Sequence, residues 1–314
     1  MTAARDSRKV IYAAIAANVA IAIGKYAAAI LTGSSAMLAE AFHSTADSGN
    51  ELLLLIGMKR SARPPDALHP YGHGKALYFY SLLVAVYIFG VGGGLAIHDG
   101  ISHLRHPQLG DHPAWNYAVL LFAIGFELYS WFISYRELQR RKDPDESVWD
   151  EIIGSKDPTV FTVFLEDTAG IIGACLALLG IFLGHVFHNP YFDPAASILI
   201  GLLLAAMAFF LGRESGALLV GERTNRATMK KVREIITADP SVERAGDLLT
   251  MQLGPNQVLL TVEIQFRRPL NIDQLEAAID RIETRIRQAE PTIDRIFIEA
   301  ESFTGKSQPN ARAA

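Results

Sequence analysis

The sequence predicts a helical membrane protein: a bundle of six transmembrane helices followed by a small cytoplasmic α+β domain of ferredoxin-like or metallochaperone-like type. Of the 314 residues, 50% are apolar and only 20% are charged. The apolar residues come in long blocks and not at an amphipathic period, which is typical of membrane helices. From about Gly221 the chain becomes charge-balanced, with the periodicity of soluble elements. We therefore expect a membrane domain over residues 1–220, a cytoplasmic domain over residues 221–303 and a disordered tail over residues 304–314.

Six apolar runs are long enough to cross a hydrocarbon core of about 30 Å. They lie near Val10–Leu31, Met37–Gly57, Leu77–Ile101, Trp115–Tyr135, Val160–Val186 and Pro194–Leu211. The first run is longer than the apolar part of a signal peptide, so we expect it to remain as an uncleaved span.

The basic residues of the loops decide the expected orientation. Lysine and arginine are concentrated between runs two and three and between runs four and five, whereas the opposite loops contain only Arg105 as a strong base. Because these residues favour the cytoplasmic side, both termini are expected there. We interpret the chain as an integral protein of a bacterial inner membrane, in contact with the lipid bilayer.

The segment after Gly221 is expected to form five elements in the order helix, strand, strand, helix, strand. They are predicted at Ala227–Ala238, Asp247–Leu253, Gln257–Phe266, Asn271–Ala289 and Ile293–Glu299. Thr224 and Asn225 are cap candidates for the first helix. The second helix carries an apolar stripe made of Ile272, Leu275, Ile279, Ile282 and Ile286. Two helices on one face of such a sheet leave its other face for a partner.

The second apolar run contains a histidine and an aspartate four residues apart, His43 and Asp47. On a helix this spacing places both side chains on one face, where an imidazole nitrogen and a carboxylate oxygen can share one ion. An ionisable group near the centre of a bilayer costs roughly 2.5–3.5 kcal/mol to insert, so such a pair is expected to have a function. We predict a metal site here.

The fifth run contains two adjacent acids, Glu166 and Asp167, among apolar side chains. Adjacent helical residues point about 100° apart, so only one of them is expected to face the ion of His43 and Asp47 directly. The other should face a neighbouring helix or a water-filled path. An alternative is that these acids are protonated, or paired with a base such as Lys25 in the first run.

Two polar residues elsewhere in the spans remain open in role. Glu127 in the fourth run is interpreted as a further ligand, a proton carrier or a partner in a hydrogen bond between helices. Asn50 in the second run is either a ligand or an interhelical hydrogen bonder.

The loop between runs two and three offers a second candidate metal site. Asp66, His69 and His73 follow one another at spacings of three and four residues. Two imidazole nitrogens and one carboxylate oxygen suit Zn²⁺, with water or another group completing a tetrahedron. The alternative is a solvated basic loop.

Several classes of function are excluded by what the sequence lacks. One cysteine, Cys175, rules out a disulfide framework or a cysteine-based zinc cluster within one chain. Neither a His-Glu-x-x-His metalloenzyme motif nor a Gly-x-Ser-x-Gly nucleophile turn is present. Nothing indicates binding of nucleic acid, and no organic cofactor is expected. We therefore do not expect an enzyme of either kind.

Taken together, these residues resemble the cation diffusion facilitator family. The resemblance covers nearly the whole chain: six spans, the α+β domain, Gly33-Ser34-Ser35 followed by His43-Ser-Thr-Ala-Asp47, and His69-Pro-Tyr-Gly-His73-Gly-Lys75. It implies a dimeric exporter that exchanges Zn²⁺ or, in some branches, Mn²⁺, Fe²⁺, Co²⁺ or Ni²⁺ for protons. It also implies a transport site with two ligands from span two and two from span five, which here map to His43, Asp47 and Asp167.

The chain departs from the family pattern within its spans. The family's first ligand of span five falls on Val163, while Glu166 directly precedes Asp167. This Glu-Asp-Thr-Ala pattern resembles the branch that contains the animal mitochondrial zinc transporter. The fourth ligand is therefore open among Glu166, Glu127 and water. Leu77 also replaces the acid that usually follows the histidine-glycine-lysine motif.

The cytoplasmic domain departs as well, because it has no histidine or cysteine. Any metal there would have to bind carboxylates such as Glu263, Asp294 or Glu299. A homodimer through this domain and the spans is expected to pack through apolar contacts across a two-fold axis.

The expected function is export of a divalent metal ion from the cytoplasm in exchange for protons, by alternating access. Imidazole and carboxylate bind metal only when deprotonated, which couples the ion to protons. One imidazole with carboxylates favours Zn²⁺, and Mn²⁺, Fe²⁺ or Co²⁺ would also be accepted. The alternative is a non-transporting metal sensor or regulatory protein, in which the buried site only holds the bundle together.

Overall fold

The computed structural model describes residues 18–108, 113–141, 152 and 156–302. The chain divides into two units: one made of Met1–Arg60 and Leu77–Gly216, the other of Ser61–Ala76 and Ala217–Ala314. The expected tail over residues 304–314 lies outside the described residues.

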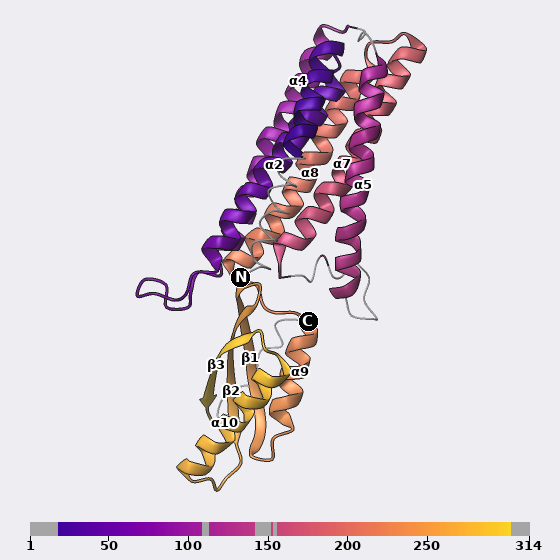
Figure 1. Ribbon diagram of the computed structural model, residues 1–314. Helices are drawn as coiled ribbons and strands as arrows, with labels where there is room; N and C mark the ends of the chain where they lie inside the picture. The colour runs from indigo at the N-terminus through magenta and orange to yellow at the C-terminus, as the bar shows by residue number, and fades with distance from the viewer. Residues whose placement is uncertain (1–17, 109–112, 142–151, 153–155, 303–314) are drawn as a thin grey trace, which may run out of the picture. The chain divides into compact units, whose positions relative to one another are not determined.

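The first unit is a bundle of long helices that run alongside one another (Figure 1). The chain is helical over Asn18–Thr32, and the further elements are α2 (Ser35–Ser61), α3 (Ala76–Tyr87), η1 (Ile88–Gly94), α4 (Leu95–Arg105), α5 (Pro113–Arg141), α7 (Pro158–Phe187) and α8 (Phe192–Val220). Gly33, with a φ of 67°, turns the chain between the first of these helices and α2, a conformation that glycine adopts without strain.

Four of the helical segments are long and apolar enough to cross a membrane, in agreement with the last four predicted spans. They are Ala76–Arg105, Ala114–Arg140, Phe161–Phe187 and Phe192–Val220. The predicted count of six spans is not shown. The helix before α2 is described only from Asn18, and α2 is 27 residues long but is made polar by residues such as Glu40, Asp47 and Glu51.

The third predicted span is not a uniform α-helix, because α3 and α4 are joined by the seven-residue π-helix η1. A Cβ atom added at Gly93 would lie 2.9 Å from the carbonyl oxygen of Gly201 in α8. One added at Gly92 would lie 3.6 Å from the Cβ of Ala46 in α2. Small residues let helix backbones approach closely, so η1 packs tightly between α8 and the turn of α2 that carries Asp47.

The second unit contains a three-stranded sheet and two helices in the predicted order. Its elements are α9 (Arg226–Thr237), β1 (Val242–Gly254), β2 (Gln257–Phe266), α10 (Ile272–Ala289) and β3 (Ile293–Ala300) (Figure 1). The sheet order is β1-β2-β3, with β1 antiparallel and β3 parallel to β2. A parallel neighbour needs a crossover connection, which α10 supplies.

Capping and packing explain the boundaries of these two helices. Asn225 caps α9 by accepting a hydrogen bond from the backbone N–H of Thr228 at 2.8 Å, and Asn271 caps α10 in the same way. The core lies between the helices and one face of the sheet. The predicted stripe of α10 was wrong at Ile272, which is 74% exposed in the first turn. Ile282 and Ile286 of the predicted stripe are buried, together with Ala278.

The other face of the sheet is open and apolar in the described chain. Leu249 and Phe297 both pair in register with Thr261, and they are 65% and 51% exposed. Met251, two residues after Leu249, is 37% exposed. Side chains two residues apart on a strand share a face, so these three form one patch.

An ion pair between a buried aspartate and a half-exposed arginine joins the end of α9 to α10. Arg281 donates hydrogen bonds of 2.7 and 2.8 Å to the two carboxylate oxygens of Asp239, whose side chain is fully buried. These bonds, together with one from the backbone N–H of Ser241, hold the pKa of Asp239 below its ordinary value. A lowered pKa stabilises the fold above the ordinary aspartate value of about 3.9, and the contribution is lost as the pH falls through the folded value.

We expect Asp239→Ala to lower the stability of this unit by about 1.5–3 kcal/mol at neutral pH, because two charge-assisted hydrogen bonds are lost. Hydrogen–deuterium exchange of α10 in the full chain measures the effect. Glu283→Ala, which removes an exposed pair with Arg287 on the same helix, is the control and should change little. A difference between Asp239→Ala and wild type that persists undiminished well below pH 3 would contradict the ion-pair explanation.

Candidate metal centre

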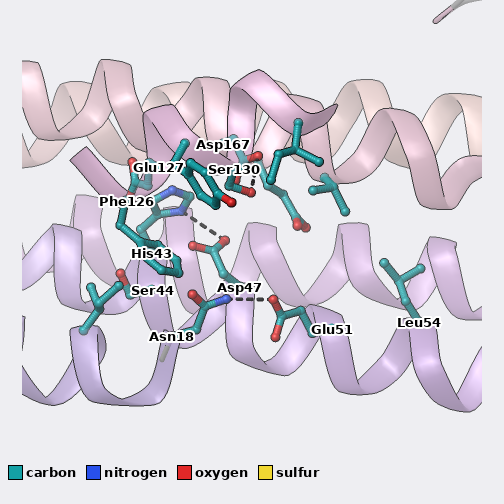
Figure 2. Close-up of a pocket in the computed structure, with 15 residues that line it drawn as sticks. Asn18, His43, Ser44, Asp47, Glu51, Leu54, Phe126, Glu127, Ser130 and Asp167 are labelled. Atoms are coloured by element: carbon teal, nitrogen blue, oxygen red, sulfur yellow. Dashed lines mark hydrogen bonds and ion pairs between the residues drawn. The ribbon is translucent and has the colours of Figure 1, made fainter. Parts of the chain in front are cut away.

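The α2 pair lies where its spacing predicted. His43 Nδ1 and Asp47 Oδ1 are 3.5 Å apart on one face of the helix (Figure 2). His43 is 1% exposed. Within the described part of the chain, both ring nitrogens of His43 and Oδ1 of Asp47 are buried without a hydrogen-bond partner. A buried polar atom left unsatisfied costs about 1–3 kcal/mol, so these atoms are candidates for binding a ligand.

The two adjacent acids of α7 reach the same place but are held by different helices. Glu166 Oε1 accepts a hydrogen bond of 2.8 Å from the side-chain amide of Asn50 in α2. Asp167 Oδ2 accepts one of 2.8 Å from Ser130 Oγ in α5. Both acids line the cavity described next, so α2, α5 and α7 are joined around it.

The cavity has a volume of about 380 Å³ and contains side chains from the helix before α2, α2, α5 and α7. Figure 2 shows His43 and Asp47 facing Ser130 and Asp167 across it. Its polar lining residues are Asn18, His43, Ser44, Asp47, Glu51, Glu127, Tyr129, Ser130, Glu166 and Asp167. Val163, at the position of the family's usual ligand, also lines the cavity and offers no donor atom. Among the described residues, the four predicted ligands do not bring their donor atoms within 4.8 Å of one another.

Sequence reasoning missed two acids of α2. Glu51 lines the cavity and accepts a hydrogen bond of 2.7 Å from Asn18 of the preceding helix. Glu40 is fully buried and lies 2.9 Å from Lys25 Nζ. The sequence spacing could have revealed both acids. Glu40, His43, Asp47 and Glu51 follow one another at steps of three and four residues, which places them on one helix face.

Lys25 does not pair with the α7 acids, which was one of the two alternatives considered for them. Its ammonium contacts Glu40 and, at 3.4 Å, Glu127 Oε1. Glu127 lines the cavity, and one oxygen of its carboxylate forms an ion pair with Lys25. Asn50 donates a hydrogen bond to Glu166 in another helix, which is one of the two roles predicted for it.

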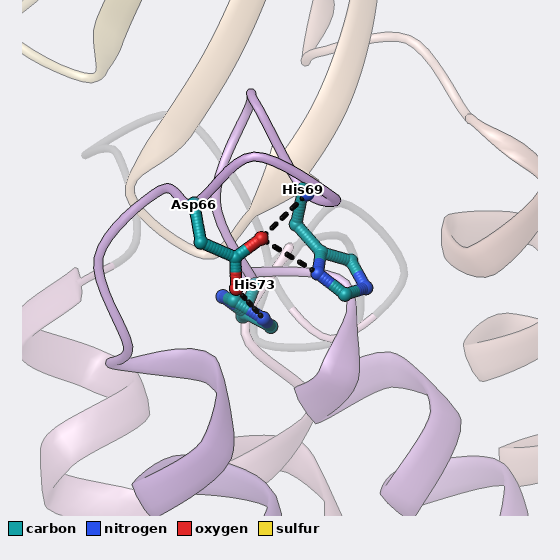
Figure 3. Close-up of side chains that lie close together, drawn as sticks. All are labelled: Asp66, His69 and His73. Atoms are coloured by element: carbon teal, nitrogen blue, oxygen red, sulfur yellow. Dashed lines mark hydrogen bonds and ion pairs between the residues drawn. The ribbon is translucent and has the colours of Figure 1, made fainter.

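The second candidate site lies in the loop of residues 61–76, within the unit of the sheet. Asp66 stands between the two histidines: its Oδ1 is 3.1 Å from His69 Nδ1 and its Oδ2 is 3.4 Å from His73 Nε2 (Figure 3). One donor atom from each residue lies within 4.8 Å of the others. Hydrogen bonds from the backbone N–H groups of His69 and Leu68 to Asp66 hold the pKa of its carboxyl below the ordinary value.

The C-terminal end of this loop packs against the β1–β2 turn of the same unit. A Cβ atom at Gly74 would overlap the backbone of Leu253, and Lys75 Nζ donates to the carbonyl of Leu219 at 3.3 Å. The end of the loop at Gly74 and Lys75 is therefore held against its unit, whereas Asp66 and His69 are exposed.

A third group of carboxylates lies near the C-terminal ends of β2 and β3 and consists of Glu263, Glu299 and Glu301. It contains two of the three acids suggested for this domain. The third, Asp294, lies 3.7 Å from Arg295 instead. Exposed acidic groups of this kind are common without an ion, so this group carries no assignment.

Comparison with known proteins gives matches over most of the chain. The model of the cation efflux transmembrane domain matches residues 11–220, and that of the cation efflux cytoplasmic domain matches residues 225–303. The human mitochondrial protein named proton-coupled zinc antiporter SLC30A9 is 32% identical over 259 residues, which cover 82% of this chain and 46% of that protein. This chain thus spans about half the length of SLC30A9.

Two further relatives come from a plant and a bacterium. Metal tolerance protein C4 of Arabidopsis thaliana is 30% identical over 267 residues, 83% of this chain and 58% of that protein. Magnetosome protein MamM of Paramagnetospirillum magneticum is 27% identical over 256 residues, 79% of this chain and 74% of that protein.

These matches confirm the predicted resemblance, including the branch of the animal mitochondrial zinc transporter. Both matched models describe domains of cation efflux proteins. The described residues include four long apolar helices, and the chain is an integral membrane protein that belongs to the cation efflux, or cation diffusion facilitator, family.

Proposed function

We propose that this chain is a divalent cation/proton antiporter that exports Zn²⁺ from the cytoplasm by alternating access. The observation that carries the proposal is the cavity between α2, α5 and α7, where one buried imidazole and several carboxylates meet among apolar helices. Such groups are expensive to retain in a membrane, and in transporters they mark the path of ions and protons.

The proposed transport ligands are His43, Asp47, Asp167 and Glu166. Two donor atoms of a tetrahedral zinc site, each about 2.0–2.1 Å from the ion, are about 3.4 Å apart. The 3.5 Å between His43 Nδ1 and Asp47 Oδ1 fits that separation. Asp167 and Glu166 would complete the site by rotating their side chains into the cavity. Val163 supplies no ligand, so Glu166 takes the fourth position.

The metal preference follows from the donor set. One nitrogen with carboxylate oxygens and no sulfur suits Zn²⁺ and also accepts Mn²⁺, Fe²⁺ or Co²⁺. These ligands bind metal only without their protons, so protons entering from the opposite side displace the ion and are carried inward on the same groups. The relative's printed name, proton-coupled zinc antiporter, supports zinc and proton coupling for this chain.

The proposed assembly is a homodimer in a bacterial inner membrane with both termini in the cytoplasm and six spans. The match to a cation efflux cytoplasmic domain model and the open apolar patch of Leu249, Met251 and Phe297 support a dimer. The distribution of lysine and arginine between the loops supports the orientation.

Flux through liposomes tests this function. The purified protein should move protons out when Zn²⁺ enters, with smaller responses to Mn²⁺, Fe²⁺ and Co²⁺. A protein that binds these ions tightly but moves neither metal nor protons would overturn the antiporter and favour the second candidate, a non-transporting sensor that Val163 and Leu77 keep in consideration.

We also propose that Asp66, His69 and His73 bind a metal ion on the cytoplasmic side. The double variant His69→Ala/His73→Ala should lose about one bound Zn²⁺ per chain in titration, because two of three donor groups are gone. Substituted Co²⁺, whose visible absorption reports tetrahedral coordination, provides the measurement. His98→Ala removes an exposed histidine outside the loop and is the control. An unchanged metal count in the double variant would refute this site.

A further inference from the structure

A buried lysine joins three helices beside the transport cavity. Lys25, in the helix before α2, is 0% exposed, and its ammonium lies 2.9 Å from Glu40 Oε2 in α2 and 3.4 Å from Glu127 Oε1 in α5. Burying an ammonium costs several kcal/mol unless it is paired and hydrogen-bonded. The lysine is therefore a fixed positive charge held by two carboxylates.

Helix α7 is shaped to receive these carboxylates. A Cβ atom added at Gly170 would overlap the carboxylate of Glu127, and one added at Gly173 would overlap that of Glu40. The two glycines are three residues apart, so they lie on one face of α7, one turn beyond Asp167. Each carboxylate thus has its own glycine in α7 that leaves space for it. Such a fit is more specific than the contact of a surface ion pair.

Glu127 is the member of the group that also reaches the cavity. It lines the cavity together with His43, Asp47 and Asp167, whereas Lys25 and Glu40 do not. Within the described residues its Oε2 is buried without a hydrogen-bond partner. One oxygen of the carboxylate, Oε1, therefore contacts Lys25, while Oε2 accepts no hydrogen bond. The ion pair with Lys25 and the seat at Gly170 hold this carboxylate in its position.

We propose that Lys25 is a positioning residue that holds Glu127 out of the coordination sphere of the transported ion and so limits the affinity of the site. The inference rests on the transport site proposed above. An additional carboxylate ligand raises the affinity for a divalent cation. A transporter must also release its ion, and dissociation slows as affinity rises. The tethered ammonium thus keeps the site weak enough to turn over.

The decisive variant is Lys25→Met/Glu40→Gln, which removes one charge of each sign and frees Glu127. We expect Zn²⁺ binding in detergent to become about tenfold tighter, measured by competition with a chromophoric chelator. In liposomes the apparent KM for Zn²⁺ should fall and kcat should fall with it. A loss of packing alone would lower kcat without tightening binding.

Gly170→Ala provides a second route that leaves Lys25 and Glu40 in place. The added methyl group displaces the Glu127 carboxylate from its seat, and tighter binding is again expected. Gly173→Ala is the matched control, because its methyl group meets Glu40 and should leave the affinity near that of wild type.

Glu127→Gln tests whether Glu127 itself causes the tighter Zn²⁺ binding expected in the other variants. Alone it should leave the affinity for Zn²⁺ almost unchanged, since Glu127 does not bind the ion in the wild type. Added to Lys25→Met/Glu40→Gln or to Gly170→Ala, it should return the affinity to that of wild type. Affinity that is unchanged or weaker in both routes, or a gain that survives Glu127→Gln, would overturn the inference. In that case wild-type flux would still support the antiporter, whereas absence of binding and flux in the wild type would reject the antiporter itself.

Discussion

Replacing Asp47 or Asp167 by alanine is expected to reduce metal-dependent proton movement in liposomes by at least about a hundredfold. Each change removes one proposed ligand from a site that has only four. Even partners that merely orient a ligand cost 10–100-fold in metal affinity or activity, so direct ligands should cost more. Zn²⁺ uptake and internal pH, recorded together, measure the effect on both ions.

The controls for this prediction separate ligation from folding. Asp47→Asn keeps the size of the side chain and should fail as badly as alanine, because an uncharged amide is a poor metal ligand. Asp294→Ala changes a carboxylate that is 57% exposed in the second unit and should leave flux intact. Glu166→Ala decides the fourth ligand: loss of flux assigns Glu166 to the site, and retained flux leaves the position to water. Full flux in Asp47→Ala and Asp167→Ala together would reject the proposed site.

The parts of the fold and site that sequence reasoning predicted are those that depend on local spacing. His43 and Asp47 face each other because four residues make about one helical turn, and α9, β1, β2, α10 and β3 follow from periodicity and turn residues. The strand predicted at Gln257–Phe266 has the bounds of β2.

The parts that could not be predicted depend on contacts between distant residues. Lys25 meets Glu127 across 102 positions, and nothing in the local sequence of either residue indicates the other. The hydrogen bond from Asn50 to Glu166 spans 116 positions. The π-helix η1 likewise depends on the close approach of α8. The run of glycines in η1 does not by itself predict which helix packs against it.

The second large effect is expected at the start of α2, where Asp193→Ala should lower stability by about 2–4 kcal/mol. The first N–H groups of a helix lack intrahelical partners. At α2 the carboxylate of Asp193, from the first turn of α8, accepts the N–H groups of Ser35 at 2.6 Å and Ala36 at 3.4 Å. Ser35 and Ala36 are both 0% exposed, so water cannot replace these bonds. Ser34 Oγ also donates to this carboxylate.

This capping from another helix explains the role of Gly33-Ser34-Ser35 in physical terms. Gly33 turns the chain, Ser34 accepts the N–H of Met37 at 3.1 Å, and Ser35 donates at 2.7 Å to Asp99 of α4. The N-terminal end of α2 is thereby tied to α4 and α8. Loss of the Asp193 carboxylate leaves two buried N–H groups unsatisfied, each at a cost of about 1–3 kcal/mol.

The measurement is the temperature at which the detergent-solubilised protein loses its monodisperse elution peak, which should fall by roughly 5–10 °C in Asp193→Ala. Asp193→Asn keeps one carbonyl acceptor for the N–H of Ser35 and should lose at most about half as much. Ser48→Ala removes only a hydrogen bond to the carbonyl of Ser44 within α2 and should have little effect. If Asp193→Asn were as unstable as Asp193→Ala, the negative charge at the helix N-terminus would be the dominant contribution; if neither variant were destabilised, α2 would not depend on Asp193 for its cap.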